Sequence, residues 1–111
     1  MRKLSTVLFC LLAATGVARA DKTERTWQAK CASCHGDDGK AQTAKGKEMA
    51  IRDVTTAEWQ KASDDDLQKS IENGVDRTQD GKKQQMDPYK DKLKPEQIKD
   101  LIKYMRSLAA K

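Results

Sequence analysis

The sequence predicts a small all-α domain, and three observations lead to this fold class. Residues 95–108 carry one apolar stripe at steps of three and four residues, formed by Ile98, Leu101, Ile102, Met105 and Leu108. Residues 63–66, Ser-Asp-Asp-Asp, have the pattern of a helix N-terminus. After residue 20 no segment alternates apolar and polar residues as a strand would. We therefore expect helices joined by polar loops.

Residues 1–20 are expected to be a secretory signal peptide that is removed. Arg2 and Lys3 precede an apolar stretch, residues 4–17, which is too short to cross a bilayer because that takes ~20 residues. Ala18, Arg19 and Ala20 form an A-x-A cleavage site. Cys10 would leave with this segment. A retained segment that anchors the protein stays an alternative.

Residues 21–111 then form one exported domain. Loss of the three basic residues in the segment lowers the formal net charge from +5 to +2, which gives little support to nucleic-acid binding. Few aromatic side chains remain, namely Trp27, Trp59, Tyr89 and Tyr104. A short chain with so little core material usually needs an additional stabilising group.

Residues 31–35, Cys-Ala-Ser-Cys-His, match the C-x-x-C-H attachment motif of c-type haem. On a helix, positions i, i+3 and i+4 share one face. Cys31 and Cys34 can therefore bond to the two haem vinyl groups while His35 reaches the iron. His35 is the single histidine of the chain. We expect one covalently attached haem per chain, with His35 as the proximal iron ligand.

Other uses of these residues fit less well. A structural zinc site needs four Cys or His ligands, and residues 21–111 contain three. A thioredoxin-like dithiol needs a βαβ context, which the pattern lacks. A disulfide between Cys31 and Cys34 would leave His35 without a role.

The segment before the motif, residues 23–30, is expected to be a short helix. Trp27 lies one turn before Cys31, so its indole should pack beside the haem or against another helix. Residues 36–49 are polar, with glycines at positions 36, 39 and 46, and should form a loop. We expect a backbone carbonyl of this loop to bond the outer nitrogen of His35, as such groups do for metal-bound imidazoles.

Residues 55–59 predict a short helical turn that ends at Trp59. The Trp59 indole either packs in the core or donates its N–H to a haem propionate. The next helix begins after Ser63, whose hydroxyl can cap free amides while Asp66 completes a capping box. Its three aspartates lie at the positive end of the helix, where negative side chains are stabilising. The acidic run therefore needs no ligand-binding role. Asn73 and Gly74 are expected to end it.

Residues 75–88 are polar and aperiodic, so we expect a loop rather than a helix or strand. The last helix should follow Pro95, a favoured first helical residue. Five lysines surround Met86, and they could direct docking to an acidic surface of a redox partner: Lys82, Lys83, Lys90, Lys92 and Lys94. Three aspartates, Asp80, Asp87 and Asp91, are interspersed and weaken that interpretation.

The second axial iron ligand can be narrowed by elimination. The chain has no second histidine, and a lysine must first lose a proton from a group of pKa ~10.4. Met1 leaves with the signal peptide, and Met105 belongs to the apolar stripe. Met49 and Met86 remain. Met49 lies near Ile51 and can be explained as core, whereas Met86 is an isolated thioether in a polar segment, which favours Met86.

With the C-x-x-C-H run, the sequence resembles the class I c-type cytochromes over residues 21–111. Similar proteins place an aromatic residue one turn before the first cysteine, as Trp27 is here. They pack it against a Leu-x-x-aromatic pair of the last helix, which Leu101 and Tyr104 match. They also take the second iron ligand from a methionine before that helix, where Met86 stands.

The resemblance implies three to five short helices wrapped around one haem, with His35 and Met86 as axial ligands. It implies a single-electron carrier that shuttles between redox partner proteins, a monomer in the bacterial periplasm, and not an enzyme. The lack of a second histidine for distal catalysis agrees with this. A haem-binding subunit or a gas or redox sensor domain of a larger oxidoreductase system stays an alternative.

Overall fold

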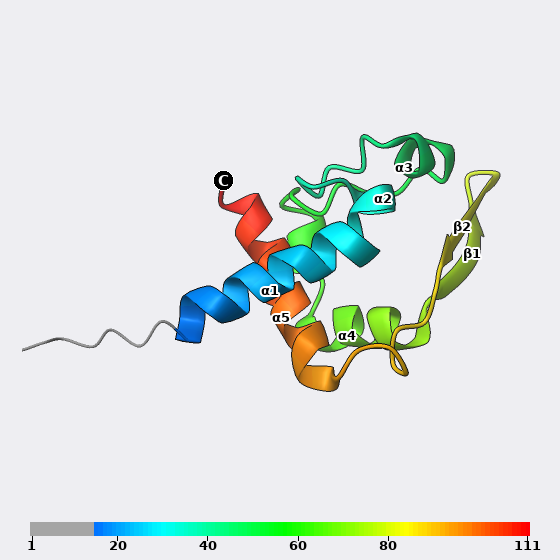
Figure 1. Ribbon diagram of the computed structural model, residues 1–111. Coiled ribbons are helices and arrows are strands. Elements are labelled where there is room, and N and C mark those ends of the chain that lie inside the picture. The colour runs from blue at the N-terminus through cyan, green and yellow to red at the C-terminus, as the bar shows by residue number, and fades with distance from the viewer. Residues whose placement is uncertain (1–14) are drawn as a thin grey trace, which may run out of the picture.

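The computed structural model describes residues 15–111 and is mostly helical in that range. Five α-helices, one 3-10 helix and one β-hairpin follow each other along these described residues (Figure 1). Their order is α1 (Thr15–Lys30), α2 (Ala32–His35), α3 (Ala44–Glu48), η1 (Trp59–Lys61), α4 (Asp64–Asn73), β1 (Val75–Gln79), β2 (Lys82–Met86) and α5 (Pro95–Ala109). The all-α prediction is confirmed, with a small two-stranded sheet in addition. Within residues 15–111, no helix has the length and apolar character needed to cross a membrane.

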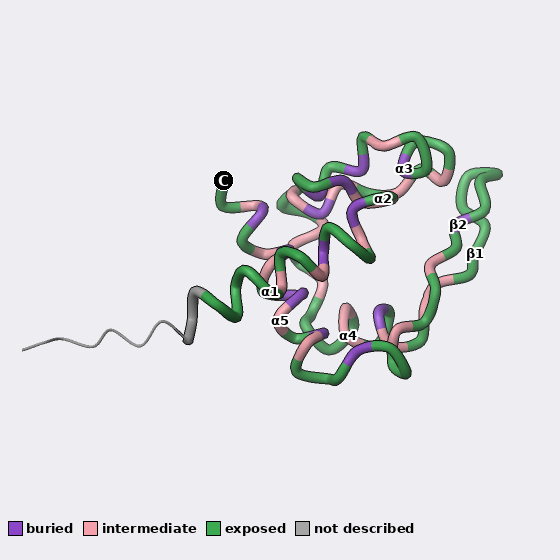
Figure 2. Tube along the Cα trace, viewed as in Figure 1, coloured by how far each residue is buried: buried purple, intermediate pink, exposed green. Residues whose placement is uncertain are grey.

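The core lies where α1 crosses α5. The apolar stripe predicted for the last helix is buried, and it comprises Ile98, Leu101, Ile102, Met105 and Leu108. Trp27 of α1 is 1% exposed, and its ring lies 5.6 Å from that of Tyr104. The predicted packing of Trp27 against the last helix is therefore confirmed. Figure 2 shows buried residues at this crossing and along the α2–α3 stretch, whereas the hairpin is mostly exposed.

Helix α1 begins earlier than the predicted start at residue 23 and passes through the expected cleavage site after Ala20. Arg19 in this extension donates from Nε to Asp100 of α5 over 2.6 Å. Because Arg19 is exposed, this ion pair contributes little to stability. Residues 1–14, with Cys10, lie outside the described residues, and the signal peptide stays a prediction.

Helix α4 begins as its sequence predicts. The hydroxyl of Ser63 accepts a hydrogen bond from the Asp66 N–H over 3.1 Å, and the three aspartates occupy the first turn. No return bond from the Asp66 carboxylate is among the contacts of the described chain, so half of the predicted capping box is formed. Asn73 is the last helical residue, and Gly74 follows it with φ +76°.

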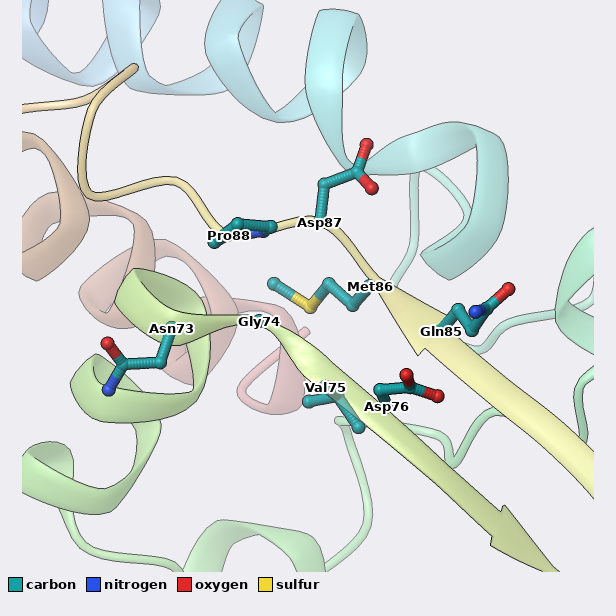
Figure 3. Close-up of a pocket in the computed structure, with 8 residues that line it drawn as sticks. All are labelled: Asn73, Gly74, Val75, Asp76, Gln85, Met86, Asp87 and Pro88. Atoms are coloured by element: carbon teal, nitrogen blue, oxygen red, sulfur yellow. The ribbon is translucent and has the colours of Figure 1, made fainter.

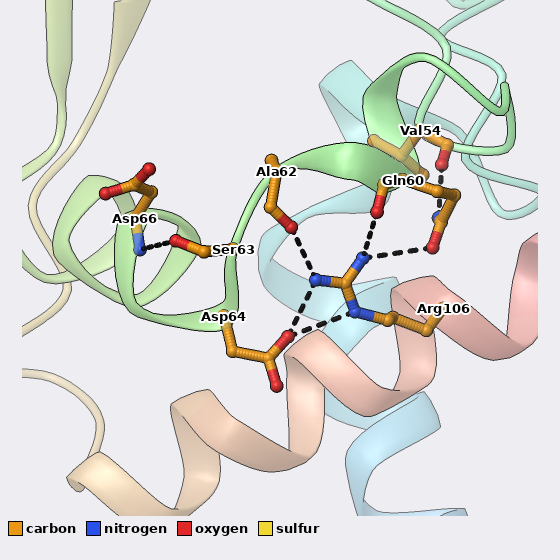
Figure 4. Close-up of polar contacts among 7 residues, drawn as sticks. All are labelled: Val54, Gln60, Ala62, Ser63, Asp64, Asp66 and Arg106. Atoms are coloured by element: carbon orange, nitrogen blue, oxygen red, sulfur yellow. Dashed lines mark hydrogen bonds and ion pairs between the residues drawn. The ribbon is translucent and has the colours of Figure 1, made fainter.

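Arg106 connects α5 to the junction between η1 and α4 (Figure 4). Its guanidinium bonds the Asp64 carboxylate at 2.7 and 3.0 Å, the Ala62 carbonyl at 2.7 Å, and two oxygens of Gln60 at 3.0 and 3.1 Å. Gln60 in turn donates to the Val54 carbonyl over 2.7 Å. One side chain of α5 thus holds the segment that carries Trp59.

The predicted loop over residues 75–88 is wrong, because most of it forms an antiparallel hairpin. Val75 pairs with Met86, and the strands turn at Asp80 and Gly81, whose φ values are +52° and +76°. Two positive φ values in a two-residue connection are typical of a type I′ turn, which Asp-Gly favours. Apart from buried Gln84 and the half-buried first pair, Val75 and Met86, the hairpin is exposed on both faces, so its strands show no apolar alternation.

Candidate functional site

The C-x-x-C-H motif lies at the junction of α1 and α2. Helix α1 ends at Lys30, and His35 closes α2 with its N–H bonded to the Cys31 carbonyl over 2.9 Å. Cys31 and Cys34 are free thiols, each half-buried, and they lie one helical turn apart as the spacing predicts. Burial raises the pKa of the Cys31 thiol to about 11, so this group is protonated at neutral pH.

His35 packs against Trp27, with ring centroids 5.6 Å apart. Its Nδ1 atom is buried and has no hydrogen-bond partner in the described structure. Burial lowers the pKa of the imidazole, because desolvation disfavours its charged form. The ring is therefore neutral at neutral pH, the state in which imidazole binds metals. The prediction that a loop carbonyl accepts a hydrogen bond from this side chain is therefore wrong.

The carbonyls of the last two motif residues and of Gly36 are engaged elsewhere. The Cys34 carbonyl accepts from the Thr43 hydroxyl at 2.8 Å, and the His35 carbonyl accepts from the Ala41 N–H at 2.8 Å. The Gly36 carbonyl accepts from the Trp27 indole at 3.0 Å. The last carbonyls of a helix lack helical partners, and these three groups satisfy them here. Their effect is to hold the backbone of the motif in place.

Sequence reasoning missed Thr43 in this role. Its hydroxyl also accepts from the Gly46 N–H over 2.9 Å, so one side chain caps α3 and bonds the motif. Gly46 permits this approach, because an added Cβ would lie 2.7 Å from the Cys34 carbonyl oxygen. A threonine three residues before a glycine at a helix start is a weak cap signal. That pattern does not indicate that the Thr43 hydroxyl also bonds the Cys34 carbonyl of α2.

Met86 is the last residue of β2 and packs half-buried against the core, as Cys31 and Trp59 also do. It lines an open pocket of about 320 Å³ with residues 73–76 and 85–88. Figure 3 shows its side chain extending toward Gly74 and Pro88. The structure therefore brings Met86 to the edge of the same core as the first cysteine of the motif.

The backbone after Met86 is held against the end of α4. The Tyr89 N–H bonds the Ile71 carbonyl over 2.9 Å, and the Lys90 N–H bonds the Glu72 carbonyl over 3.2 Å. At Gly74, an added Cβ would lie 2.5 Å from the Met86 carbonyl oxygen and 2.9 Å from the Pro88 nitrogen. This close approach makes the position of Met86 depend on a glycine at position 74.

Gly74→Ala is expected to lower the free energy of unfolding by about 1–3 kcal/mol more than Gly81→Ala. Both glycines have φ +76°, but Gly74 has ψ 179° and meets backbone, whereas nothing lies within 4 Å of an added Cβ at Gly81. Denaturant titration of the haem-loaded proteins measures the difference. Equal losses in the two variants would contradict the importance of this contact.

The other candidates differ in how far they are buried. Met105 is 5% exposed in the core, as predicted. Met49 caps α3 and is half-buried, but it is not part of the core cluster, contrary to its interpretation as a core residue. Trp59 begins η1 and is half-buried against the core. Its indole N–H has no hydrogen bond to the described residues.

Residues 20–109 match the cytochrome c family. A solved structure named KustC0563 c-type cytochrome is similar to the chain, with a TM-score of 0.63 and 32% sequence identity over 78% of this chain and 95% of that one. No curated protein matches. The family match spans nearly all of residues 21–111, and the solved relative has the same fold, so this chain belongs to the cytochrome c family.

Proposed function

We propose that this protein is an exported single-electron carrier that holds one haem c through Cys31, Cys34 and His35, with Met86 as the second axial ligand. Membership of the cytochrome c family implies a covalently bound haem and transfer of electrons to redox partners. The proposal adds the residues, the ligand pair, one haem per chain, a monomeric state and a periplasmic location.

The observation that carries the proposal is the state of His35. Its imidazole is neutral and half-buried, and no hydrogen bond to the described residues engages its side chain. The thiols of Cys31 and Cys34, one helical turn apart, are also free and form no disulfide. This donor set fits a haem held by two thioether bonds and an imidazole.

Haem supplies an iron that takes up and releases one electron. His35 and Met86 would donate to it in both oxidation states, so the surrounding side chains need little rearrangement. A thioether ligand raises the reduction potential relative to a second imidazole or a thiolate. The half-buried position of Met86 against the core supports this role.

Two surface features belong to the same proposal. Trp59 has an indole N–H free of contacts with the described residues, and we assign it as a donor to a haem propionate. The five lysines around Met86, at positions 82, 83, 90, 92 and 94, are all exposed. They suit encounter with an acidic redox partner, where opposite charge raises the association rate. Asp80, Asp87 and Asp91 are exposed among them and reduce that effect.

Binding of external ligands tests the carrier function against a sensor or an enzyme. A six-coordinate carrier should titrate reversibly with one electron and bind carbon monoxide, when reduced, only slowly. Stopped-flow absorption measures the rate on the purified holoprotein, with cyanide as the probe of the oxidised form. Rapid binding of either ligand would favour the sensor or oxidoreductase alternative, because those functions need an open iron position.

A further inference from the structure

Tyr89 connects the segment after Met86 to the haem-binding motif. Its hydroxyl donates to the Lys30 carbonyl over 3.0 Å, and Lys30 immediately precedes Cys31. Among the described contacts, this is the only side-chain hydrogen bond from residues 87–94 to α1 or α2. Tyr89 is three residues after Met86, so the bond ties the two parts of the site together.

The acceptor is available because the helix breaks at the motif. In a continuous helix the Lys30 carbonyl would accept from the Cys34 N–H, but that N–H donates to the Cys31 carbonyl instead, over 3.3 Å. The Lys30 carbonyl is therefore one of the terminal carbonyls without a helical partner. The Tyr89 hydroxyl satisfies it from a distant part of the chain.

Tyr89 is also fixed at its backbone. Its N–H bonds the Ile71 carbonyl of α4, and its own carbonyl accepts from the N–H groups of Lys92 and Leu93 over 3.0 and 2.9 Å. Burial is the main cause that raises the pKa of the phenol, so the hydroxyl keeps its proton and remains a donor at neutral pH. One residue thus joins α4, the Met86 segment and the end of α1.

We infer that Tyr89 is a positioning residue, whose hydroxyl holds the Met86 segment against the C-x-x-C-H motif and limits release of the Met86 thioether from the iron. This inference rests on the proposed function, because it assumes Met86 as a ligand. Without the hydroxyl, the segment keeps its two backbone bonds to α4 and loses its bond to α1. The motif and the Met86 segment can then separate locally while the core remains packed.

The test compares Tyr89→Phe with Tyr104→Phe in the haem-loaded protein. Tyr104 is the matched control, because it is also half-buried against the core but its hydroxyl has no hydrogen bond to the described residues. Stopped-flow absorption gives the carbon monoxide binding rate of the reduced protein. The pH at which the far-red sulfur-to-iron(III) charge-transfer band is lost gives a second measure of ligand release. Circular dichroism gives the global unfolding midpoint.

Tyr89→Phe is expected to bind carbon monoxide about two- to fivefold faster than wild type. Loss of one exposed hydrogen bond changes an equilibrium constant by about this factor, and here the equilibrium is the release of the Met86 thioether. It should lose the band at lower pH, with its unfolding midpoint shifted no more than that of Tyr104→Phe. Equal rates in Tyr89→Phe and wild type, or the same change in both variants, would overturn the inference. A wild-type protein without the band would overturn the Met86 assignment itself, and this inference with it.

Discussion

Replacing Cys31 and Cys34 together by alanine is expected to yield a protein that retains no haem after acid-acetone extraction and has no cooperative unfolding transition. The core explains the second effect. Most buried apolar residues lie on α1, α2 and α5, and residues 36–94 contribute four: Ala41, Val54, Ile71 and Leu93. A chain with so thin a core depends on a group that binds only its native state.

Absorption of the extracted polypeptide and a thermal melt followed by circular dichroism measure the two effects. Ser33→Ala is the matched control, because Ser33 lies exposed between the cysteines and leaves the C-x-x-C-H pattern intact. That variant should keep its haem through extraction and melt like the wild type. Release of haem from the wild type would contradict covalent attachment. A cooperative melt of the double variant close to that of the holoprotein would contradict the dependence of the fold on haem.

Replacing Met86 by alanine is expected to abolish the far-red charge-transfer band and open the iron to carbon monoxide. The reduction potential should fall by tenths of a volt, within the span of about 0.8 V that axial ligands cover. The physical reason is the loss of a thioether donor that favours the reduced iron. Absorption spectra, a redox titration and stopped-flow mixing measure the three effects.

Met49→Ala is the control for this prediction. Met49 is the only other methionine left open as a ligand by the sequence, and it lies half-buried at the end of α3. Its replacement should leave the band and the potential unchanged. If Met49→Ala loses the band and Met86→Ala retains it, the ligand assignment is reversed.

Several features could be predicted because they depend on residues near each other in the chain. The Ser63 cap, the spacing of the motif and the apolar stripe of α5 each occupy a few helical turns. Trp27 and Tyr104 lie far apart, but each is placed on its helix by local periodicity, and the crossing of the helices brings their rings to 5.6 Å. The resemblance to c-type cytochromes supplied the pairing itself.

Other features escaped prediction because they depend on partners distant in the sequence. The hairpin has polar strands, and the buried amide of Gln84 donates to the carbonyls of Met49 and Ala50, both at 3.0 Å. A contact of this kind produces no alternation of apolar and polar residues in the sequence. The Asp80–Gly81 turn was the one local signal of the hairpin. Similarly, a loop carbonyl was expected to bond His35, but the first carbonyl of that loop, at Gly36, accepts from the Trp27 indole, and the His35 Nδ1 atom has no partner among the described residues.

The sequence by itself determined the helical character of this protein and the cofactor class expected of it, and it indicated the residues proposed to bind that cofactor, because helix periodicity and C-x-x-C-H spacing are local properties. Only the tertiary structure decided that Gly74 meets the backbone at Met86 and that Tyr89 reaches the Lys30 carbonyl. Such contacts join segments tens of residues apart. They form only when burial of the α1 and α5 faces brings those segments together, since apolar burial is non-directional and leaves hydrogen bonds to select the final arrangement.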